Sequence, residues 1–557
     1  MTANTPAIPV PTDPTPSRKK KAPLMGPIRT NLEAFGVAIL AAVLLKWFCI
    51  EAYQIPTSSM QPTLMGDNAA GVYDRILVDK LLQTFREPKR WDITVFGYPL
   101  QKNQNYVKRM VGMPGDRLRI AGGNVYQVVD GEAGKRTFTV LRKPDDLQEG
   151  MWKNVFPARM QRRADTKALT DIFASSPASA GSESDGVFTL TLGSGATRFY
   201  FRDIADGGML DRVWDGYPEA VARAIRDKNP PDQPQEIVPD VRITATVTAE
   251  QVPDELAFEI DVTRPDFPKL TYALVVKGGK GKLVVREKDA VVGESAEFAC
   301  EIPAGSATEL AFAHVDDQLI AWRAGQELLR FDSSNWAARD GCVLPFDHAT
   351  GKLNLQSGRS VTPQIVGRGK GKLTIADLRI DRDQHYTQSG APDVIEVPEG
   401  HYYMLGDNTL QSIDSRGWTA ITVGVDAEDR VVPPETPGAR VVRGNKRAMP
   451  LQNPPDRDET PIPIASENAI VMIDEYGEIL RLKGTAAADW GKRVAFAQDG
   501  AGNGRGEWVA PETTNAPGIS FVPRQDIRGR AVLVFYPCRP LSWLMFNNWP
   551  DRFGFVR

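Results

Sequence analysis

Residues 53–64 of this 557-residue chain read YQIPTSSMQPTL and directly follow an apolar segment. Two further runs stand out, YVKRMVGMPGD at 106–116 and GDNTLQSIDSRGW at 406–418. A serine hydroxyl is a weak nucleophile unless a base lies within hydrogen-bond reach. Together the three runs predict a serine nucleophile, a lysine base and a supporting loop, all close to a membrane surface.

The apolar segment before the first run predicts a membrane-spanning helix. Residues 34–50 contain one charged side chain, Lys46, and about 17–25 residues suffice to cross a bilayer. Basic residues at 18–21 and 29 precede the segment, so the positive-inside rule places the N-terminus in the cytoplasm and everything after residue 51 outside it. A cleaved signal peptide is the competing interpretation, but residues 52–54, AYQ, make a poor cleavage site.

Composition favours a β-rich globular protein and gives no sign of nucleic-acid binding. The chain has 42% hydrophobic and 25% charged residues, a formal net charge of -3, 48 Gly and 42 Pro. Its four cysteines form no CxxC pair, and its four histidines match no zinc spacing, so we predict no metal and no cofactor. Cys300 and Cys342 can pair only if both lie outside the cytoplasm and close together, which the sequence leaves open.

The second run gives the lysine an apolar setting. Side chains alternate along a strand, so Tyr106, Lys108 and Met110 share one face and Arg109 points to the other. Burial away from water favours the neutral amine over the ammonium ion. Lys108 is therefore the predicted general base.

The three runs, together with DRILVDKL at 74–81 and FREPKRWDITVF at 85–96, resemble bacterial type I signal peptidases, which are membrane-bound Ser-Lys endopeptidases. The resemblance covers about residues 30–130, 398–420 and 518–537. It implies a signal-peptidase-like (LexA-like) β-fold, with Ser59 as nucleophile and Lys108 as base. Thr57 and the Ser59 N–H would form the oxyanion hole.

The resemblance also implies supporting roles. Ser412 would hydrogen-bond the lysine amine, Asp414 and Arg416 would form a salt bridge behind it, and Arg109 would be its structural neighbour. The family usually reads GDNRD before this serine, whereas Thr409-Leu410 follow Asn408 here. The implied pockets for small substrate side chains are lined by Tyr53, Ile55 and Pro56.

The catalytic pattern is interrupted by long insertions. Regular short strands over 242–385 predict a β-sandwich, which resembles jelly-roll domains of the concanavalin and laminin G type. A short helix is expected near 219–227, a strand pair at 469–474 and 478–483, and C-terminal aromatics resting on the membrane or in a core. The predicted fold is thus mostly β, in seven segments: a disordered basic tail (1–30), a transmembrane helix (31–51), a first catalytic segment (52–130), the sandwich insert (131–397), a second catalytic segment (398–420), a second insert (421–517) and a C-terminal catalytic segment (518–557).

Two functions from different classes fit these features, and the membrane span and the lysine run argue against a third, a cytoplasmic protease. The first is a signal peptidase of the bacterial cytoplasmic membrane, single-pass with its catalytic domain outside the cytoplasm. Its partners would be preproteins with small residues at the first and third positions before the cut, the lipid bilayer and a secretion translocon. The second is an anchored sandwich that binds glycan or protein on a decayed peptidase scaffold, and the third a self-cleaving repressor-type protease. The sequence leaves the insert's partner open.

Overall fold

The computed structural model describes most of the chain after residue 26. The described residues are 27–68, 70–99, 101–131, 136–157, 172–202, 209–217, 236–264, 267–333, 360–388, 391–418, 420–432, 436–444, 462–464, 469–474, 476, 478–483, 510–512, 520–538 and 554–556. The basic tail, the helix expected near 219–227, Cys342 and the C-terminal aromatics lie outside them. The chain divides into two compact units, residues 1–51 and 52–557.

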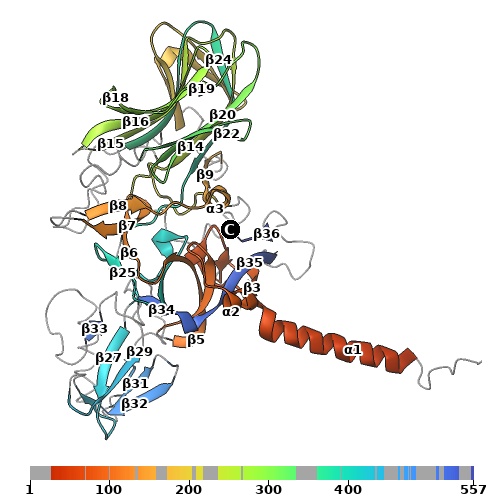
Figure 1. Ribbon diagram of the computed structural model, residues 1–557, viewed down its shortest axis with the longest axis vertical. Coiled ribbons are helices and arrows are strands. Elements are labelled where there is room, and N and C mark those ends of the chain that lie inside the picture. The colour runs from red at the N-terminus through yellow and green to blue at the C-terminus, as the bar shows by residue number, and fades with distance from the viewer. Residues whose placement is uncertain are drawn as a thin grey trace, which may run out of the picture. The chain divides into compact units, whose positions relative to one another are not determined.

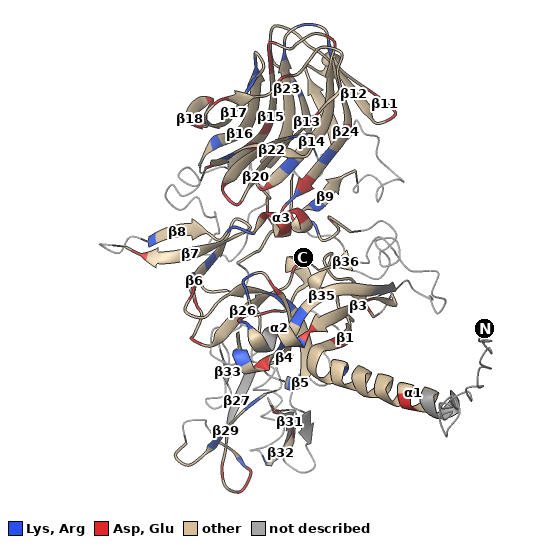
Figure 2. Ribbon diagram, turned by 45° about the vertical axis from the view of Figure 1, so that its right-hand side comes forward, with Lys and Arg blue, Asp and Glu red and all other residues tan. Residues whose placement is uncertain are grey.

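The first unit contains the expected apolar helix. Helix α1 (Pro27–Leu44) continues as a π-helical turn, η1 (Leu45–Cys49). The stretch Asn31–Cys49 is long and apolar enough to cross a membrane, since 19 residues at about 1.5 Å each approach the ~30 Å of a hydrocarbon core. In Figure 2 the described part of the α1 ribbon is almost entirely in the colour of uncharged residues.

In the second unit, one antiparallel sheet collects strands from the three predicted catalytic segments. The strand order is β1-β3-β35-β4-β5-β26-β34, with β2 on β3 and β36 on β35. A short helix, α2 (Lys80–Phe85), follows β3. The strands are β1 (Ile50–Gln54), β2 (Gly66–Asp67), β3 (Val72–Asp79), β4 (Ile93–Tyr98), β5 (Gln101–Gly112), β26 (His401–Leu405), β34 (Phe521–Pro523), β35 (Ile527–Cys538) and β36 (Gly554–Phe555).

A smaller sheet joins the two ends of the first insert. Its order is β25-β6-β7-β8, from β6 (Arg117–Ala121), β7 (Asn124–Asp130), β8 (Arg136–Val140) and β25 (Ile395–Glu396). β25 lies at the C-terminal end of the 131–397 insert, yet it pairs with β6, which precedes the insert. The two ends of the insert therefore return to one sheet, and the catalytic strands on either side of it can pair.

The first insert is a sandwich of two antiparallel sheets, as Figure 1 shows. One sheet has the order β10-β13-β23-β15-β16-β17-β18 with β19 on β17, and the other β11-β12-β24-β14-β20-β21-β22 with β9 on β24. The first sheet comprises β10 (Phe173–Ser176), β13 (Thr197–Phe201), β15 (Glu255–Arg264), β16 (Phe267–Lys277), β17 (Lys280–Glu287), β18 (Ala290–Glu294), β19 (Phe298–Ala299) and β23 (Ser360–Arg368). The second comprises β9 (Lys153–Phe156), β11 (Gly181–Ser184), β12 (Val187–Thr191), β14 (Val241–Ala249), β20 (Thr308–Val315), β21 (Gln318–Arg323), β22 (Gln326–Asp332) and β24 (Lys372–Arg382).

Alternating side chains explain why these segments form a sandwich. Along β14 the apolar residues Ile243, Ala245 and Val247 are buried, and they join the core shared by both sheets. The chain passes repeatedly from one sheet to the other, so the mostly-β, jelly-roll-like prediction is confirmed. The sandwich also begins earlier than the expected 242–385, because β9 to β13 belong to its sheets.

The second insert contributes two small sheets. One has the order β28-β27-β29 with β33 on β27, and the other β30-β31-β32. The expected strand pair at 469–483 is confirmed as β31 and β32. The strands are β27 (Ala420–Val425), β28 (Val431–Val432), β29 (Arg440–Gly444), β30 (Ile462–Ile464), β31 (Ala469–Ile473), β32 (Ile479–Lys483) and β33 (Ala510–Glu512).

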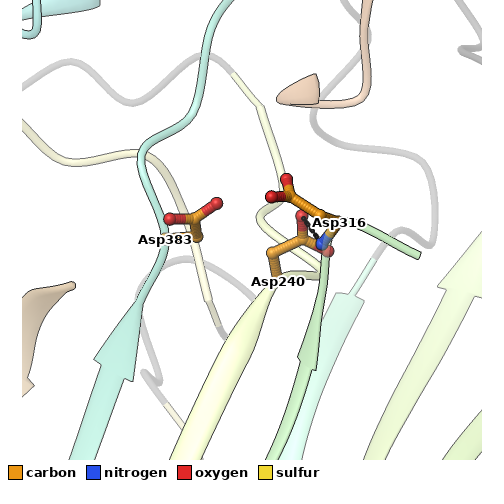
Figure 3. A group of neighbouring side chains, drawn as sticks. All are labelled: Asp240, Asp316 and Asp383. Atoms are coloured by element: carbon orange, nitrogen blue, oxygen red, sulfur yellow. Dashed lines mark hydrogen bonds between the residues drawn. The ribbon is translucent and has the colours of Figure 1, made fainter. Parts of the chain in front are cut away.

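A buried group of charges lies at the end of the sandwich that carries the β20–β21 turn. The carboxylates of Asp240, Asp316 and Asp383 point toward one another in Figure 3. Lys143, which precedes helix α3 (Asp145–Met151), places its Nζ 2.6 Å from Asp316 Oδ1 and 2.8 Å from Asp383 Oδ2. His314 Nδ1 lies 2.9 Å from Asp240 Oδ1. Burial opposes the charge of Lys143, but its two carboxylate partners outweigh burial and raise its pKa.

Asp317 adds a further buried carboxyl group at this end of the sandwich, one without a salt-bridge partner among the described residues. It is the second residue of the two-residue turn between β20 and β21, where its φ of 57° is left-handed. Burial, reinforced by the neighbouring carboxylates of Asp240 and Asp316, raises its pKa to about 7, although His314 and Arg142 act in the opposite direction. This folded-state value is well above the ordinary value near 3.9.

We predict that D317N removes the part of the unfolding free energy loss on raising the pH that comes from ionising Asp317. Between about pH 4 and 7 the folded protein binds more protons at Asp317 than the unfolded chain does, so its stability falls as pH rises through this window. Asparagine keeps the left-handed turn but cannot ionise. The gain in unfolding free energy should therefore be small at pH 4 and reach about 2–4 kcal/mol at pH 8.

Thermal and urea unfolding at both pH values would measure this difference. The matched control is D289N, because Asp289 occupies the second position of the two-residue turn between β17 and β18, with φ 73°, but is exposed. The control should leave the pH dependence unchanged. An equal gain for D317N at pH 4 and pH 8 would contradict the prediction.

Candidate active site

The predicted nucleophile lies on a single 3-10 turn, η2 (Ser58–Met60), between β1 and β2. Core side chains fix both flanks of the turn. Ile55 is 2% exposed and Met60 is fully buried in one apolar cluster, and the Ile55 N–H donates to the carbonyl of Asp74 at 2.9 Å. Ser59 is left half-buried on a turn with little freedom to move.

A glycine packs beneath this turn. A Cβ on Gly66 would lie 2.7 Å from the carbonyl oxygen of Thr57 and would collide with that of Ile55. Both obstacles are backbone atoms, which cannot rotate away as side-chain ends do. Gly66 therefore allows β2 to approach the residues that lead into Ser59.

Lys108 lies on β5 with its side chain in an apolar layer. It pairs with Thr94 of β4 and is 3% exposed. Tyr106 and Met110 share its face, as the alternation predicted, and the Tyr106 ring centroid is 5.9 Å from Nζ. This ring stacks on Tyr98 at 4.5 Å. Lys108 is thus almost fully withdrawn from water on an aromatic face of β5.

Arg109 points to the opposite face and forms a buried ion pair with Asp407. Its Nε and Nη2 donate to the two carboxylate oxygens at 2.8 and 2.7 Å, and its Nη1 donates to the carbonyl of Trp91 at 2.9 Å. The side chains are 0% and 1% exposed. Burial by itself would raise the pKa of Asp407, but the guanidinium outweighs it and holds that pKa below its ordinary value.

The loop after β26 is fastened directly to the nucleophile turn. The Asn408 N–H donates to the carbonyl of Ser59 at 3.1 Å, and Asn408 Nδ2 donates to that of Ser58 at 3.0 Å. Thr63 Oγ1 donates to Asp407 at 2.6 Å. The loop includes the 3-10 turn η6 (Thr409–Gln411). Residues more than 340 positions apart thus share one hydrogen-bond network.

Ser412 lies against the same turn. A Cβ on Gly406 would collide with the Ser412 hydroxyl and lie 2.5 Å from the carbonyl oxygen of Ser59, so these three residues meet. Among the described residues, the buried Ser412 Oγ has no hydrogen-bond partner. The expected bond to Lys108 is therefore not formed in this structure, although the hydroxyl remains available for one.

Asp414 and Arg416 form a buried ion pair of 2.6 Å behind Ser412. Asp414 Oδ2 also accepts the Gly406 N–H at 2.9 Å, and Arg416 Nη1 donates to the carbonyl of Thr387 at 2.9 Å. Burial alone would raise the pKa of Asp414, but its pairing with Arg416 lowers it. The pair therefore holds both ends of the 406–416 loop.

The residues expected to line substrate pockets differ in exposure. Pro56 is exposed, Tyr53 is half-buried against the core, and Ile55 is almost fully buried. Thr57 is exposed and has an extended backbone, φ -123° and ψ 160°, directly before the turn. Pro56 and Tyr53 therefore offer surface to a bound chain, while Ile55 lies beneath them in the core.

Sequence reasoning missed several residues that build this site. Asp407 and Asn408 stood in a quoted run but received no role, although a polar GDN triplet after a strand is itself a signal. The structure adds Thr63 from the nucleophile loop. It also adds three residues of the first insert for which the sequence offered no signal, namely Lys153, Tyr217 and Gln384.

The described residues include one group of acids with the spacing of a metal site, Asp240, Asp316 and Asp383. The Lys143 ammonium lies within 2.8 Å of two of these carboxylates, in the position a cation would take. The group is therefore charge-compensated by the protein itself. It also belongs to the sandwich and not to the network around Ser59.

Known proteins resemble the catalytic segments. The family described as signal peptidase, peptidase S26, matches residues 28–169 and 355–432. The probable signal peptidase I-2 of Synechocystis sp. is 36% identical over 118 residues, 20% of this chain and 50% of the relative. The signal peptidase I of Leptolyngbya laminosa is 34% identical over 155 residues, 26% of this chain and 68% of the relative. The chain thus spans half the length of the first relative and about two thirds of the second.

Solved β-sandwich structures are also similar, at low identity. A prokaryotic β-1,3-1,4-glucanase (lichenase) derived from a mouse hindgut metagenome has a TM-score of 0.24 and 11% identity, covering 39% of this chain and 95% of that one. The galectin LEC-6 of Caenorhabditis elegans has a TM-score of 0.17 and 12% identity, covering 27% of this chain and 86% of that one. The sandwich assignment rests on the strand order described above.

We predict that D407A severely destabilises the protein. The substitution leaves the fully buried Arg109 guanidinium without its carboxylate, and such losses cost about 3–5 kcal/mol. Urea unfolding would measure the change. D130A is the matched control, because Asp130 also pairs with an arginine, Arg117 at 2.6 Å, but on the surface. An unfolding midpoint for D407A as close to wild type as that of the control would contradict the prediction.

Proposed function

We infer the function from one premise: this chain belongs to the signal peptidase family, peptidase S26. We propose that it is a membrane-anchored serine endopeptidase that removes N-terminal signal peptides from translocated preproteins. The observation that carries the proposal is the meeting of three segments distant in sequence. The Ser59 turn contacts β5, which carries the buried Lys108, and is hydrogen-bonded to the 406–416 loop, which carries Ser412.

The proposed mechanism is acyl transfer by a Ser-Lys dyad. Neutral Lys108 takes the hydroxyl proton of Ser59, and Ser59 Oγ attacks the scissile carbonyl. The resulting tetrahedral intermediate collapses as Lys108 returns the proton to the leaving amine of the mature protein, which leaves an acyl-enzyme. Lys108 then removes a proton from water, and the water hydrolyses the ester to release the signal peptide. Ser412 would orient the amine through its buried hydroxyl, which has no hydrogen-bond partner among the described residues.

The proposed oxyanion hole combines the Ser59 N–H with the Thr57 hydroxyl. Donors fixed before the reaction stabilise the negative charge that develops on the carbonyl oxygen. Thr57 is exposed at the entrance to a turn whose flanks are buried, so its position is held while its side chain remains accessible. Arg109, Asp414 and Arg416 act as structural supports of this arrangement.

The proposed substrates are preproteins with small residues at the first and third positions before the cut. Tyr53, Ile55 and Pro56 immediately precede the oxyanion residues, with Ile55 as the buried floor and the other two nearer the surface. A shallow site of this type accepts small side chains and excludes large ones.

The apolar helix supports a single-pass anchor in the bacterial cytoplasmic membrane. The stretch Asn31–Cys49 ends ten positions before Ser59 in the sequence, and we propose that substrates are cut close to the bilayer surface. Basic residues at 18–21 favour a cytoplasmic N-terminus and place the catalytic domain outside. A secretion translocon is the proposed source of substrate.

We predict that S59A and K108A each reduce preprotein cleavage by about 10³-fold or more, because each removes one member of the dyad. Purified full-length protein and a preprotein with alanine at both specificity positions provide the assay. S58A is the matched substitution on the same turn and should retain far more activity than S59A. Equal cleavage by wild type, S59A and K108A would overturn the assignment. Failure of the folded wild type to cleave would instead favour a binding protein on a decayed scaffold.

We predict that protease added outside the cytoplasmic membrane reaches the sandwich insert. In spheroplasts the full-length band should disappear, whereas an epitope tag fused before residue 1 should remain on a small protected fragment. The physical reason is the basic charge before the helix, which retains the N-terminus inside. Cleavage confined to the first 27 residues would mean that the topology is inverted.

A further inference from the structure

Three side chains of the first insert reach the loops that carry the proposed catalytic residues. They are Lys153 on β9, where the sandwich begins, Gln384 just after β24, where it ends, and Tyr217 in the segment between β13 and β14. Lys153 is 7% exposed, Gln384 and Tyr217 3% each. All three are therefore removed from solvent, and their polar atoms depend on protein partners.

Lys153 and Gln384 meet at one backbone atom, the carbonyl oxygen of Asp407. Lys153 Nζ donates to it at 3.0 Å and Gln384 Nε2 at 2.9 Å. The side chain of this same residue holds Arg109, which is adjacent to Lys108 in the sequence. Burial lowers the pKa of Lys153 to about 7, and the amine donates a hydrogen bond in either protonation state.

The segment that leaves the sandwich continues along the loop. Gln384 Nε2 also donates to Thr409 Oγ1 at 3.2 Å, and that hydroxyl donates to the carbonyl of His385 at 2.7 Å. Two residues later, the carbonyl of Thr387 accepts the Nη1 of Arg416 at 2.9 Å. The exit segment of the insert is thus bonded to the 406–416 loop at its beginning, middle and end.

Tyr217 connects this loop to the nucleophile turn. Its hydroxyl donates to Gln61 Oε1 at 2.6 Å and accepts from Asn408 Nδ2 at 3.4 Å. Gln61 is two residues after Ser59, and its Nε2 donates to the carbonyl of Gly66 at 2.9 Å. One phenol hydroxyl of the insert therefore bridges the loop of Ser59 and the loop of Ser412.

We propose that Lys153, Tyr217 and Gln384 are positioning residues for catalysis, so that the inserted sandwich is a working component of the active site. The inference rests on the proposed peptidase function and extends it to the insert. The three side chains act on backbone and amide groups of the two loops, and so set where Ser59 and Ser412 lie relative to Lys108. Small misplacements matter, since an error near 1 Å costs about 10²-fold in rate.

The experiment compares full-length variants in detergent micelles with the same preprotein substrate. Y217F removes only the bridging hydroxyl, K153M removes one donor to Asp407, and K153R restores a donor at that position. Y272F is the matched control, because Tyr272 is another buried tyrosine of the sandwich, with its ring stacked on His314 at 3.9 Å. Thermal midpoints establish that each variant is folded at the assay temperature.

The expected result is a fall in kcat with little change in KM. Y217F should lose about 10-fold in kcat and K153M about 10–100-fold, whereas KM changes by less than about threefold. K153R should recover some of the loss, and Y272F should match wild type. Wild-type kcat in both Y217F and K153M would overturn the proposal.

Amide hydrogen exchange provides a second readout that does not depend on activity. In Y217F and K153M, exchange should become faster in peptides covering 57–64 and 403–418, which contain the Asn408 N–H bonded to Ser59. Faster exchange throughout the sandwich, or none, would mean a merely structural role and would overturn the proposal. If the folded wild type cleaves no preprotein, the proposed function fails and the catalytic role of the three residues fails with it, while the exchange pattern still shows whether they order the two loops.

Discussion

The buried ion pair between Arg109 and Asp407 is the interaction on which the rest of this structure depends. The two residues are 298 positions apart, and both are withdrawn from water. Removing two charges from water costs several kcal/mol each, a penalty offset only when every hydrogen-bonding group is satisfied. Here the carbonyl of Trp91 accepts from Arg109, and the hydroxyls of Thr63 and Tyr386 donate to Asp407. The pair forms only when the strand carrying Lys108 and the loop carrying Ser412 have both folded into place, so it ties catalytic geometry to complete folding.

Arg109 precedes the first insert in the sequence and Asp407 follows it, so the insert must allow these two segments to meet. The insert leaves after β8 and returns at β25, and both strands belong to one small sheet, so its two ends are held together. Such an insertion need only preserve the distance between its ends. This one does more, because Lys153 and Gln384, at its two ends, bind the Asp407 carbonyl. Asp407 therefore binds Arg109 through its carboxylate and the insert through its backbone carbonyl.

Patterns local in sequence were predicted well. Alternation placed Lys108 among apolar groups and Arg109 on the opposite face, and turn residues marked the strand pair at 469–483. The sandwich was predicted from the same alternation, although its first strands were missed because β9 to β13 span only four or five residues each, too few to show a clear alternation. The contacts of Asp407, Asn408, Lys153 and Tyr217 were not predicted, because a polar side chain in a loop has no periodicity that reveals its partner.

The sequence by itself determined the apolar helix, the β-rich class and the family, and it supplied the residues proposed as a Ser-Lys dyad. These follow from side-chain chemistry and short-range spacing, which are written directly in the chain. Only the tertiary structure decided that Asp407 is the shared partner of Arg109 and the insert, that Ile55 is buried in the core, and that Tyr217 bridges the loops of Ser59 and Ser412. Those outcomes depend on desolvation and on distances between segments hundreds of residues apart, which packing alone sets.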